Sequence, residues 1–256
     1  MQNLFDVSGK VALVTGGSRG IGEMIAEGYV RNGVRVYISA RKAEACDQTA
    51  ERLSEIGECI SIPADLSTTE GLMGLVGTIR ERESKLDILV NNAGATWGAS
   101  FDEFPVNGWD KVMAINVKSP FFLSQQLIDL LVEAGSHEDP ARIINIGSID
   151  GLHVSELETY SYAASKSAII HLTRMMAKNL ARRHVTVNAV APGPFESKMM
   201  AHTLATMKDS IVQGIPRGRI GEPSDMAGVA IFLASKAGSY LNGVVIPVDG
   251  GLSTTV

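Results

Sequence analysis

Thr15-Gly16-Gly17-Ser18-Arg19-Gly20-Ile21-Gly22 directly continues the apolar run Val11–Thr15 and opens a segment with the apolar spacing of a helix, Ile21–Asn32. Glycines between a strand and a helix let the backbone turn sharply and approach a pyrophosphate, which then lies at the partly positive helix amino terminus. A tight turn without a ligand would use similar residues, and the chain has 26 glycines. The position after a strand and before a helix favours a dinucleotide site.

Short apolar runs rich in β-branched residues alternate with helical segments along the chain, which is typical of βαβ units that build a parallel sheet. The segment Thr68–Arg82 opens with threonines able to cap a helix, and Ser224–Leu233 begins just after Pro223. We therefore expect an α/β fold. The seven predicted strands are Val11–Thr15, Val34–Ser39, Cys59–Pro63, Ile88–Asn91, Arg142–Ile146, Val185–Val190 and Val244–Val248.

Nothing in the composition divides the chain, because it has no low-complexity linker, internal repeat or charge block. A single domain over residues 1–256 is expected. The least patterned stretch is Phe195–Glu222, rich in Met, Lys and Gly. We interpret it as a mobile excursion above the sheet, a substrate lid.

Composition also limits the function classes. The chain has 23 basic and 28 acidic residues and a net charge of −5, so we expect neither nucleic acid nor an anionic membrane as a partner. Cys46 and Cys59 lack metal-ligand spacing and the density of a secreted disulfide scaffold, which favours a reducing cytoplasm. Residues 1–9 lack a basic segment followed by an apolar run, and no run of about 18 apolar residues occurs, so neither export nor a membrane span is expected.

The end of the second predicted strand bears on the choice of nicotinamide cofactor. An NAD site usually offers Asp or Glu there to the adenosine ribose, whereas this chain reads Ile38-Ser39-Ala40-Arg41-Lys42. Arg41, together with Arg19 of the glycine loop, would form a fork around a 2′-phosphate, because guanidinium matches phosphate geometry. Alternatively, Arg41 and Lys42 are solvated residues at the start of a helix. The missing carboxylate and the two arginines together favour NADP(H).

A second chemical signal is Tyr162-Ala163-Ala164-Ser165-Lys166, which places tyrosine and lysine four positions apart, on one face of a helix. Chance supplies such a pair in many chains, so its placement must decide. Ser148 follows the fifth predicted strand at its carboxyl end, where open α/β sheets hold their ligands. Asn116 lies on the helical segment ahead of that strand. Four polar groups around one crevice indicate a catalytic site.

These motifs, in this order, resemble those of the short-chain dehydrogenase/reductase family across essentially the whole chain. Besides the glycine loop and the four polar residues, the shared features are Asp65, Asn91-Asn92-Ala93-Gly94 and Pro192-Gly193. The resemblance implies a Rossmann-type three-layer α/β/α sandwich, a homotetramer or dimer, and the catalytic set Asn116, Ser148, Tyr162 and Lys166. The NADP(H) contacts that we expect are Gly16, Ser18, Arg19, Gly20, Ile21, Arg41, Asp65, Leu66, Asn92, Ala93, Gly94, Tyr162, Lys166, Pro192, Gly193, Phe195 and Ser197.

Within the family the chain is most similar to 3-oxoacyl reductases acting on acyl-carrier-protein or CoA thioesters. NADPH would give hydride to the ketone carbon while Tyr162 gives a proton to its oxygen, with Ser148 hydrogen-bonding that oxygen. Lys166 would lower the phenol pKa from within a desolvated crevice, and Asn116 would hold water linking Lys166 to solvent. Tyr160 is a rival proton donor, because Ser148 and Tyr162 lie one residue further apart than in many relatives. Four positions after Tyr160, however, comes Ala164 rather than Lys.

The substrate is less well determined. Arg182 and Arg183 would suit an acidic carrier protein, whereas the acidic stretch Gly135–Asp139 ahead of the fifth strand argues against one. Another alcohol or ketone, such as a polyketide, sugar or cyclic ketone, is the alternative. A cofactor-sensing protein without turnover would have a broken catalytic set, and this set is intact.

Other conspicuous residues have ordinary interpretations. The five histidines lack metal-ligand pairing, so no metal is expected. Trp97 would either edge the substrate pocket or pack ordinarily, and Trp109 is assigned to the core. Three methionines of the expected lid would line an adaptable acyl pocket or pack on a helix: Met199, Met200 and Met207. The histidines are His137, His153, His171, His184 and His202.

Overall fold

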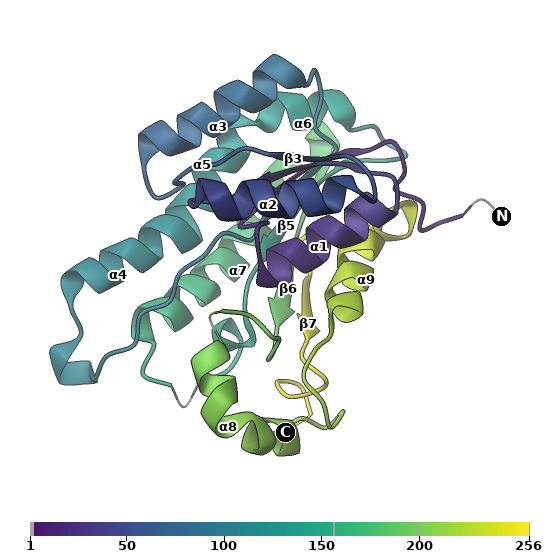
Figure 1. The fold of residues 1–256 in the computed structure, drawn as a ribbon. Coiled ribbons are helices and arrows are strands. Elements are labelled where there is room, and N and C mark those ends of the chain that lie inside the picture. Colours follow the sequence, from purple (N-terminus) through teal and green to yellow (C-terminus); the bar gives the residue numbers. More distant parts are fainter. Residues whose placement is uncertain (1–2, 156, 199, 256) are drawn as a thin grey trace.

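The computed structural model describes residues 3–155, 157–198 and 200–255. Among these residues, seven strands form one all-parallel sheet in the order β3-β2-β1-β4-β5-β6-β7 (Figure 1). The predicted fold class is confirmed, and each predicted strand is found with bounds that differ by a few residues at most. The strands are β1 (Val11–Thr15), β2 (Arg35–Ser39), β3 (Cys59–Ser61), β4 (Ile88–Asn91), β5 (Ala141–Ile146), β6 (Val185–Pro192) and β7 (Val245–Val248).

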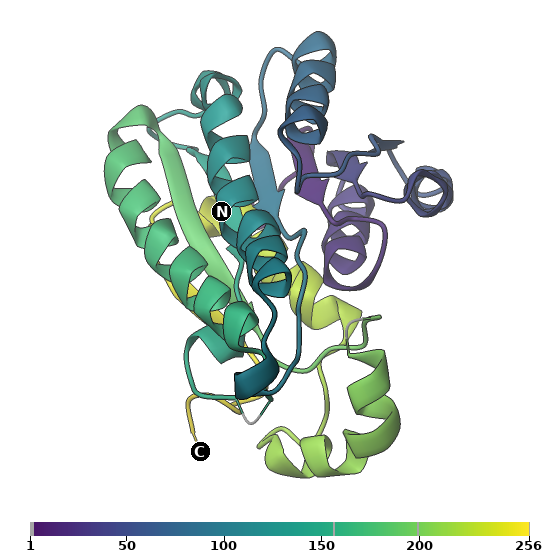
Figure 2. The same ribbon diagram turned by 90° about the vertical axis from the view of Figure 1, so that its left-hand side faces the viewer.

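Helices lie on both faces of the sheet, so that the fold has three layers (Figures 1 and 2). They are α1 (Gly20–Arg31), α2 (Ala43–Ser54), α3 (Thr69–Arg82), α4 (Val106–Met113), α5 (Ser119–Gln126), α6 (Ile128–Ala134), α7 (Tyr160–Leu180), α8 (Ala201–Gly214) and α9 (Pro223–Ala234). One core cluster joins the sheet to α1, α2 and α9, and the other joins it to α3, α5, α6 and α7. Because both faces of the strands are buried, the strands are continuous apolar runs in the sequence.

The strand order positions the crevice. From β1 the chain moves outward through β2 to β3 and then returns to β4, on the other side of β1. The connections that follow β1 and β4 therefore leave in opposite directions, and a crevice opens between them at the carboxyl ends of the strands. Segments that follow β1, β4, β5 and β6 meet at this edge of the sheet, which we call the carboxyl edge.

Helix ends follow the signals in the sequence. The Thr68 hydroxyl accepts a 3.0 Å hydrogen bond from the Gly71 N–H and caps α3. Pro223 begins α9, where Glu222 and Asp225 form a reciprocal capping box. These local devices fix where each helix begins, and thus how its first turn faces the sheet.

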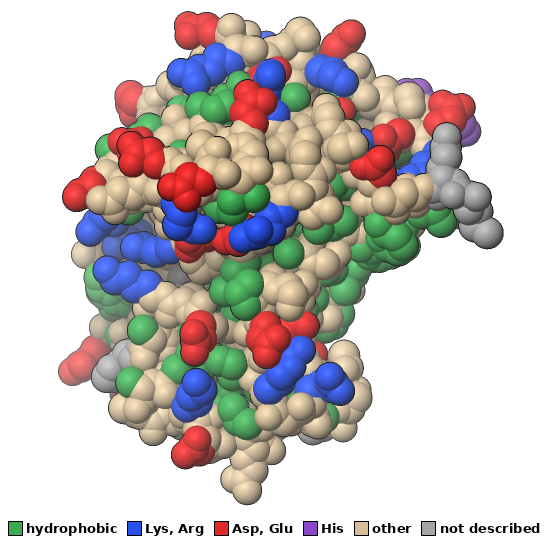
Figure 3. Space-filling view, turned by 45° about the vertical axis from the view of Figure 1, so that its right-hand side comes forward, with side chains coloured by type: hydrophobic (Ala, Val, Ile, Leu, Met, Phe, Trp, Pro, Cys, Tyr) green, Lys and Arg blue, Asp and Glu red, His purple; other side chains and the backbone are tan. Residues whose placement is uncertain are grey.

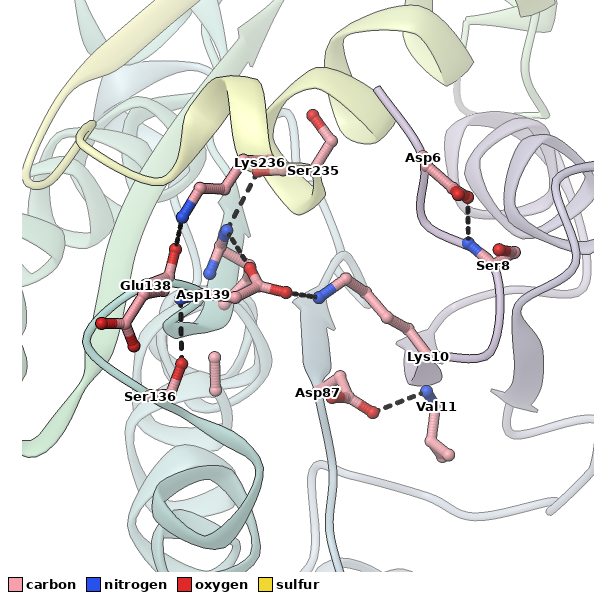
Figure 4. Close-up of polar contacts among 12 residues, drawn as sticks. Asp6, Ser8, Lys10, Val11, Asp87, Ser136, Glu138, Asp139, Ser235 and Lys236 are labelled. Atoms are coloured by element: carbon pink, nitrogen blue, oxygen red, sulfur yellow. Dashed lines mark hydrogen bonds and ion pairs between the residues drawn. The ribbon is translucent and has the colours of Figure 1, made fainter. Parts of the chain in front are cut away.

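A polar network closes the opposite, amino edge of the sheet, and Figure 4 shows Lys10 and Lys236 directed at the loop that carries Asp139. Lys10 and Arg142 both pair with Asp139, at 2.5 and 2.8 Å. Arg142 is 1% exposed and also donates to two main-chain carbonyls at the end of α9, so its buried charge is compensated. In the acidic stretch 135–139, the Asp139 carboxylate is therefore paired with basic residues. The whole stretch lies away from the carboxyl edge.

The stretch 195–222 contains a helix, α8, that the sequence pattern did not predict. The stretch leaves the carboxyl end of β6 and returns through a bridge between Phe195 and Gly221. Figures 1 and 2 show α8 at the carboxyl edge, set apart from the main helical layers. None of the helices that the structure describes is long and apolar enough to cross a bilayer.

Candidate active site

The glycine loop is tightly held at the end of β1. The Gly16 N–H donates to the Ser39 carbonyl at 2.7 Å, and Gly16 has a φ of +66°, which favours glycine. A Cβ on Gly22 would lie 2.3 Å from the Gly16 carbonyl oxygen, so a larger residue does not fit there. The N-cap residue Arg19 makes no side-chain hydrogen bond to α1, which leaves the first amides of the helix to an anion. This cradle fits a pyrophosphate.

Thr15 ties the end of β4 to the glycine loop. Its hydroxyl accepts 3.0 Å hydrogen bonds from the N–H groups of Asn92 and Ala93 and donates to the Val90 carbonyl. The Asn92 amide group in turn donates to the Thr15 carbonyl at 2.8 Å. Sequence reasoning did not single out Thr15 for this role, because its partners lie more than 70 residues away.

The two arginines predicted to bind a phosphate follow neighbouring strands, Arg19 after β1 and Arg41 after β2. Arg19 and Arg41 are both exposed, and within the described part of the chain neither forms an ion pair with a carboxylate. Hydrogen bonds from Ser67 hold the pKa of the Asp65 carboxyl below its usual range, and the nearby Arg41 adds to this effect. In Figure 3, Lys and Arg side chains gather beside a hollow that separates the lower lobe from the rest of this face.

The four predicted catalytic residues converge at the carboxyl edge. Tyr162 and Lys166 share one face of α7, with the Lys166 ammonium 5.4 Å from the centre of the phenol ring. Lys166 is 6% exposed and donates to the Ile146 carbonyl at 2.8 Å. Ser148 starts the short helical turn η3 (Ile149–Gly151) that packs on α7, and its hydroxyl accepts from the Asp150 N–H at 3.1 Å.

Asn116 lies in a π-helical turn, η2 (Ala114–Lys118), between α4 and α5. Its side-chain oxygen accepts from the Ala95 N–H, and its amide group donates to the Ala95 carbonyl and the Ser165 hydroxyl, all at 2.9 Å. π-turns are rare and are frequent at functional sites. Both amide hydrogens are used by these bonds, so a water held by Asn116 would have to donate to its oxygen or to its main-chain carbonyl.

Comparisons with known proteins agree over nearly the whole chain. A family model described as Enoyl-(Acyl carrier protein) reductase matches residues 16–253. The rhamnolipids biosynthesis 3-oxoacyl-[acyl-carrier-protein] reductase of Pseudomonas aeruginosa is 51% identical over 255 residues, which cover 98% of this chain and 99% of that protein. The chain belongs to the short-chain dehydrogenase/reductase family. The resemblance that the motifs carried, to the 3-oxoacyl reductases and in particular to this pseudomonad enzyme, is confirmed.

Solved members of the short-chain dehydrogenase/reductase family have the same fold as this chain. The Pseudomonas aeruginosa RhlG/NADP active-site complex matches 99% of this chain and 100% of its own, with a TM-score of 0.94 and 50% identity. A gluconate 5-dehydrogenase of Burkholderia cenocepacia, in complex with NADP and tartrate, matches 99% and 98% of the two chains, with a TM-score of 0.91 and 32% identity.

Burial is the largest influence on the electrostatics of the Tyr162–Lys166 pair. Burial raises the pKa of Tyr162 to about 12, against a lowering effect of the Ser148 hydroxyl, and burial lowers the pKa of Lys166 to about 8. We expected Lys166 to lower the phenol pKa. That effect stays a prediction; in the structure the Lys166 ammonium is bonded to the Ile146 carbonyl and lies over the phenol ring face. At neutral pH the phenol is therefore protonated, the form that can give a proton.

The rival tyrosine faces elsewhere. Tyr160 is 37% exposed, its hydroxyl donates to Glu158 at 3.1 Å, and its ring packs edge-to-face against Phe101 and Phe104. The assignment of Trp109 to the core was wrong. Trp109 is 41% exposed, because the first turn of α4 projects beyond the packed layers. Among the aromatic rings that the structure describes, only that of Phe104 packs against it.

Trp97 has the packing role that was one of its two predicted alternatives. Its ring lies against Gly108 of α4, where a Cβ would be only 2.7 Å away, and the Lys111 ammonium lies 5.5 Å from the ring centre. Met207 is 46% exposed on α8, and Met199 falls outside the described residues. No three His, Cys, Asp or Glu side chains in the described ranges gather to hold a metal.

The remaining predicted cofactor residues also lie at the carboxyl edge. A Cβ on Gly20 would lie 3.2 Å from the Ser197 Cβ, so the segment after β6 approaches the glycine loop. The Phe195 ring, by contrast, is 2% exposed and packs on Gly221, which leaves only its main chain for a ligand. The predicted contacts follow five strands: Gly16, Ser18, Gly20 and Ile21 after β1, Arg41 after β2, Asp65 and Leu66 after β3, Asn92, Ala93 and Gly94 after β4, and Gly193 and Ser197 after Pro192 of β6.

Replacing Lys166 with methionine should stabilise the fold. Burial lowers the Lys166 pKa from 10.5 to about 8, so a charged ammonium disfavours the folded state at neutral pH, and this cost fades as the pH rises toward the unfolded pKa. The substitution also removes the hydrogen bond to Ile146. With that loss subtracted, we expect the free energy of unfolding at neutral pH to rise by about 1 to 3 kcal/mol. Thermal unfolding at pH 7 and near pH 10.5 measures it. An unchanged or lower midpoint at neutral pH would show that the buried ammonium costs nothing.

Proposed function

We propose that this protein is an NADPH-dependent oxidoreductase acting on CH–OH groups, which reduces a 3-oxoacyl thioester to a 3-hydroxyacyl thioester in lipid or fatty acid biosynthesis. One observation carries the proposal above the others. A buried, protonated Tyr162 phenol lies beside Ser148 and Lys166 at the carboxyl edge, next to a glycine cradle. The 51% identity to the 3-oxoacyl reductase of Pseudomonas aeruginosa supports the substrate class.

NADP(H) is the cofactor that these residues fit. The glycine cradle and the first amides of α1 suit the pyrophosphate. The guanidinium groups of Arg19 and Arg41, which form no ion pair with the residues that the structure describes, suit a 2′-phosphate. RhlG and the gluconate 5-dehydrogenase were both solved with NADP. Asp65 would hold the adenine end, and Lys166 the ribose beside the nicotinamide.

Each residue of the site has a separate role in the reduction. NADPH, when bound in the glycine cradle, would supply the hydride for the ketone carbon. Tyr162 gives its proton to the ketone oxygen, a contribution of about 10² to 10⁴ in rate. The Ser148 oxygen accepts from the Asp150 N–H, and its own hydrogen would donate to the developing alkoxide. Asn116 joins the segment after β4 to α7 and so positions both catalytic side chains.

The surroundings of the site favour an apolar substrate over a sugar acid. The segment that leads from η3 into α7 carries exposed apolar side chains, with Val154 95% and Leu157 50% exposed. These groups suit an acyl chain, whereas the carboxylate and hydroxyls of a ketogluconate would need polar partners. Substrates of the gluconate 5-dehydrogenase type are the second candidate, because of that relative's similarity.

The basic residues predicted to meet a carrier protein lie at the other end of α7 from the catalytic pair. Arg182 and Arg183 follow α7, whose 21 residues extend about 30 Å from the start that carries Tyr162. Within one chain they therefore lie far from the site. The acidic stretch 135–139 lies at the amino edge and bears on neither candidate.

The substrate class is tested by following NADPH oxidation with a matched series. 3-Oxoacyl thioesters of increasing chain length, on CoA and on acyl carrier protein, are compared with 5-ketogluconate and a cyclic ketone. We expect kcat/KM to rise with acyl chain length and to be at least about tenfold above that of the ketogluconate, since each buried methylene contributes about 0.8 kcal/mol. A preference for the ketogluconate would replace the proposal with the second candidate.

The proposal also covers the domain organisation, the oligomeric state and the cellular location of the protein. A single sheet in one chain supports one domain over residues 1–256, with 195–222 as a substrate lid. We propose a homotetramer, supported by exposed Phe121 and Phe122 on α5 and Met175 on α7, and a cytoplasmic enzyme, supported by two buried free cysteines. Sedimentation at several concentrations tests the assembly.

A further inference from the structure

A buried cluster of polar side chains lies between the sheet and the helices that carry the catalytic residues. The Asn91 amide group donates to the Asn145 side-chain oxygen at 2.9 Å and to the Ser124 hydroxyl at 3.2 Å. The Asn145 amide group donates to the Thr173 hydroxyl at 2.9 Å. Each of these side chains is at most 5% exposed. The cluster therefore links β4 and β5 to α7, with a branch to α5.

These elements are the ones that supply the catalytic residues. β5 leads to the catalytic serine, and α5 continues the π-turn that holds Asn116. On α7, Thr173 lies seven positions after Lys166, about two turns further along the same helical face. Lys166 itself donates to the carbonyl of Ile146, the neighbour of Asn145 on β5, at 2.8 Å. Hydrogen bonds at two points therefore hold this face of α7 to the end of β5.

Apolar contacts alone would press α7 against the sheet without fixing its position along the strands. The surroundings of the cluster are apolar, with Ile143 and Val187 of the sheet and Met176 of α7 in one core cluster. Apolar burial is non-directional, whereas a hydrogen bond is confined to a narrow range of distances and angles. A buried hydrogen bond adds little net stability, because water binds the same groups in the unfolded chain. A directional role explains the cluster better than a stabilising one.

The Thr173 hydroxyl is held in one direction. It donates to the Ile169 carbonyl, one turn earlier on α7, at 2.8 Å, and accepts from the Asn145 amide group. Asn145 is held in turn by its bond from Asn91. Because the partners on both sides are fixed, the hydroxyl cannot rotate to follow a displaced helix. A shift of α7 along β5 therefore breaks the bond between Thr173 and Asn145.

We propose that Thr173 is a positioning residue for the reaction, which through Asn145 fixes where α7 lies along β5. The position of α7 in turn places the Tyr162 phenol and the Lys166 ammonium at the carboxyl edge. This rests on the catalytic roles proposed above for that pair. Thr173 lies about 10 Å along the helix from Lys166, at 1.5 Å per residue, so it acts through the helix and not by contact with substrate. A misplacement of about 1 Å at the reacting groups costs about 100-fold in rate.

Thr173→Val should lower kcat about 100-fold while the dissociation constant of NADPH stays within about twofold of wild type. Valine keeps the shape of the side chain and loses the hydroxyl, whereas Thr173→Ser keeps the hydroxyl and should restore kcat. Steady-state kinetics and NADPH titration measure these quantities. In crystal structures of wild type and Thr173→Val in one crystal form, α7 should be displaced along β5, and the Lys166 ammonium should lie further than 2.8 Å from the Ile146 carbonyl.

Thr186→Val is the matched control. Thr186 is 7% exposed on β6, and its hydroxyl donates to the Ala141 carbonyl at 3.4 Å, near the amino edge. The substitution should lower stability and leave kcat unchanged. The double variant Asn145→Leu/Thr173→Val removes both bonding partners, so its unfolding midpoint should lie above that of Thr173→Val while kcat stays low. It also carries the kinetic test if Thr173→Val does not fold.

A low kcat in the double variant, with α7 displaced in Thr173→Val, supports the proposal. Wild-type kcat in Thr173→Val, an unmoved α7, or a kcat that recovers together with stability in the double variant would overturn it. The same loss of kcat in Thr186→Val would also overturn it. The crystal comparison needs no substrate, so the proposed function fails separately, through absence of NADPH oxidation by the wild type with every 3-oxoacyl thioester.

Discussion

Tyr162→Phe should lower the rate of NADPH oxidation about 10³-fold or more while leaving the dissociation constant of NADPH within about twofold of wild type. General acid catalysis contributes about 10² to 10⁴ in rate, and the phenylalanine ring keeps the packing under the Lys166 ammonium. Steady-state kinetics and fluorescence titration with NADPH measure the two quantities separately.

Tyr160→Phe is the control for this effect. It removes a hydroxyl that donates to Glu158 at the surface, so turnover should stay near the wild-type rate. Retained turnover in Tyr162→Phe together with loss in Tyr160→Phe would move the proton donor to the other tyrosine. Weakened NADPH binding in Tyr162→Phe would instead indicate a structural role for the phenol.

The double variant Arg19→Ala/Arg41→Ala should bind NADPH about 100-fold more weakly and NADH almost unchanged. Each charge-assisted contact to the 2′-phosphate is worth about 1.5 kcal/mol at an exposed site, and two such contacts make a difference of about two powers of ten. Titration with both cofactors at two salt concentrations measures it, and the NADPH deficit should shrink at high salt.

Lys42→Ala is the matched variant for this prediction, since Lys42 is exposed and adjacent to Arg41. Its effect should be several-fold smaller, because an ammonium cannot make the paired contacts of a guanidinium. Equal weakening of NADPH and NADH by the arginine variant would mean that the two side chains serve the pyrophosphate or the fold, and the basis for the NADP preference would be lost.

Much of the fold was predictable because its signals are local. Strands that are buried on both faces appear in the sequence as apolar runs. Thr68 and Pro223 are residue types that favour helix starts, and they begin α3 and α9. Helix α8 was missed because none of its described side chains is buried, so its apolar residues do not mark a face that packs on the core. Trp109 was misplaced because residue type alone does not show that a first turn projects beyond its layer.

The candidate site was predictable only where its parts lie close in sequence. The four-residue spacing of Tyr162 and Lys166 predicts that they share one face of a helix. The bonds of Thr15 to Asn92 and of Asn116 to Ser165 join segments tens of residues apart, so no local pattern contains them. The pKa of a phenol likewise depends on burial and on where an ammonium points, which only the folded chain determines.

The central claim is that hydride from NADPH and a proton from Tyr162 reach the same carbonyl group of a 3-oxoacyl thioester. Reduction with NADPH deuterated at the transferred position, followed by mass spectrometry of the product, tests it most directly. We predict a 3-hydroxyacyl thioester with one deuterium on C3 from the wild type and none detectable from Tyr162→Phe in the same time. An unlabelled alcohol, or the same labelled yield from the phenylalanine variant, would contradict the account.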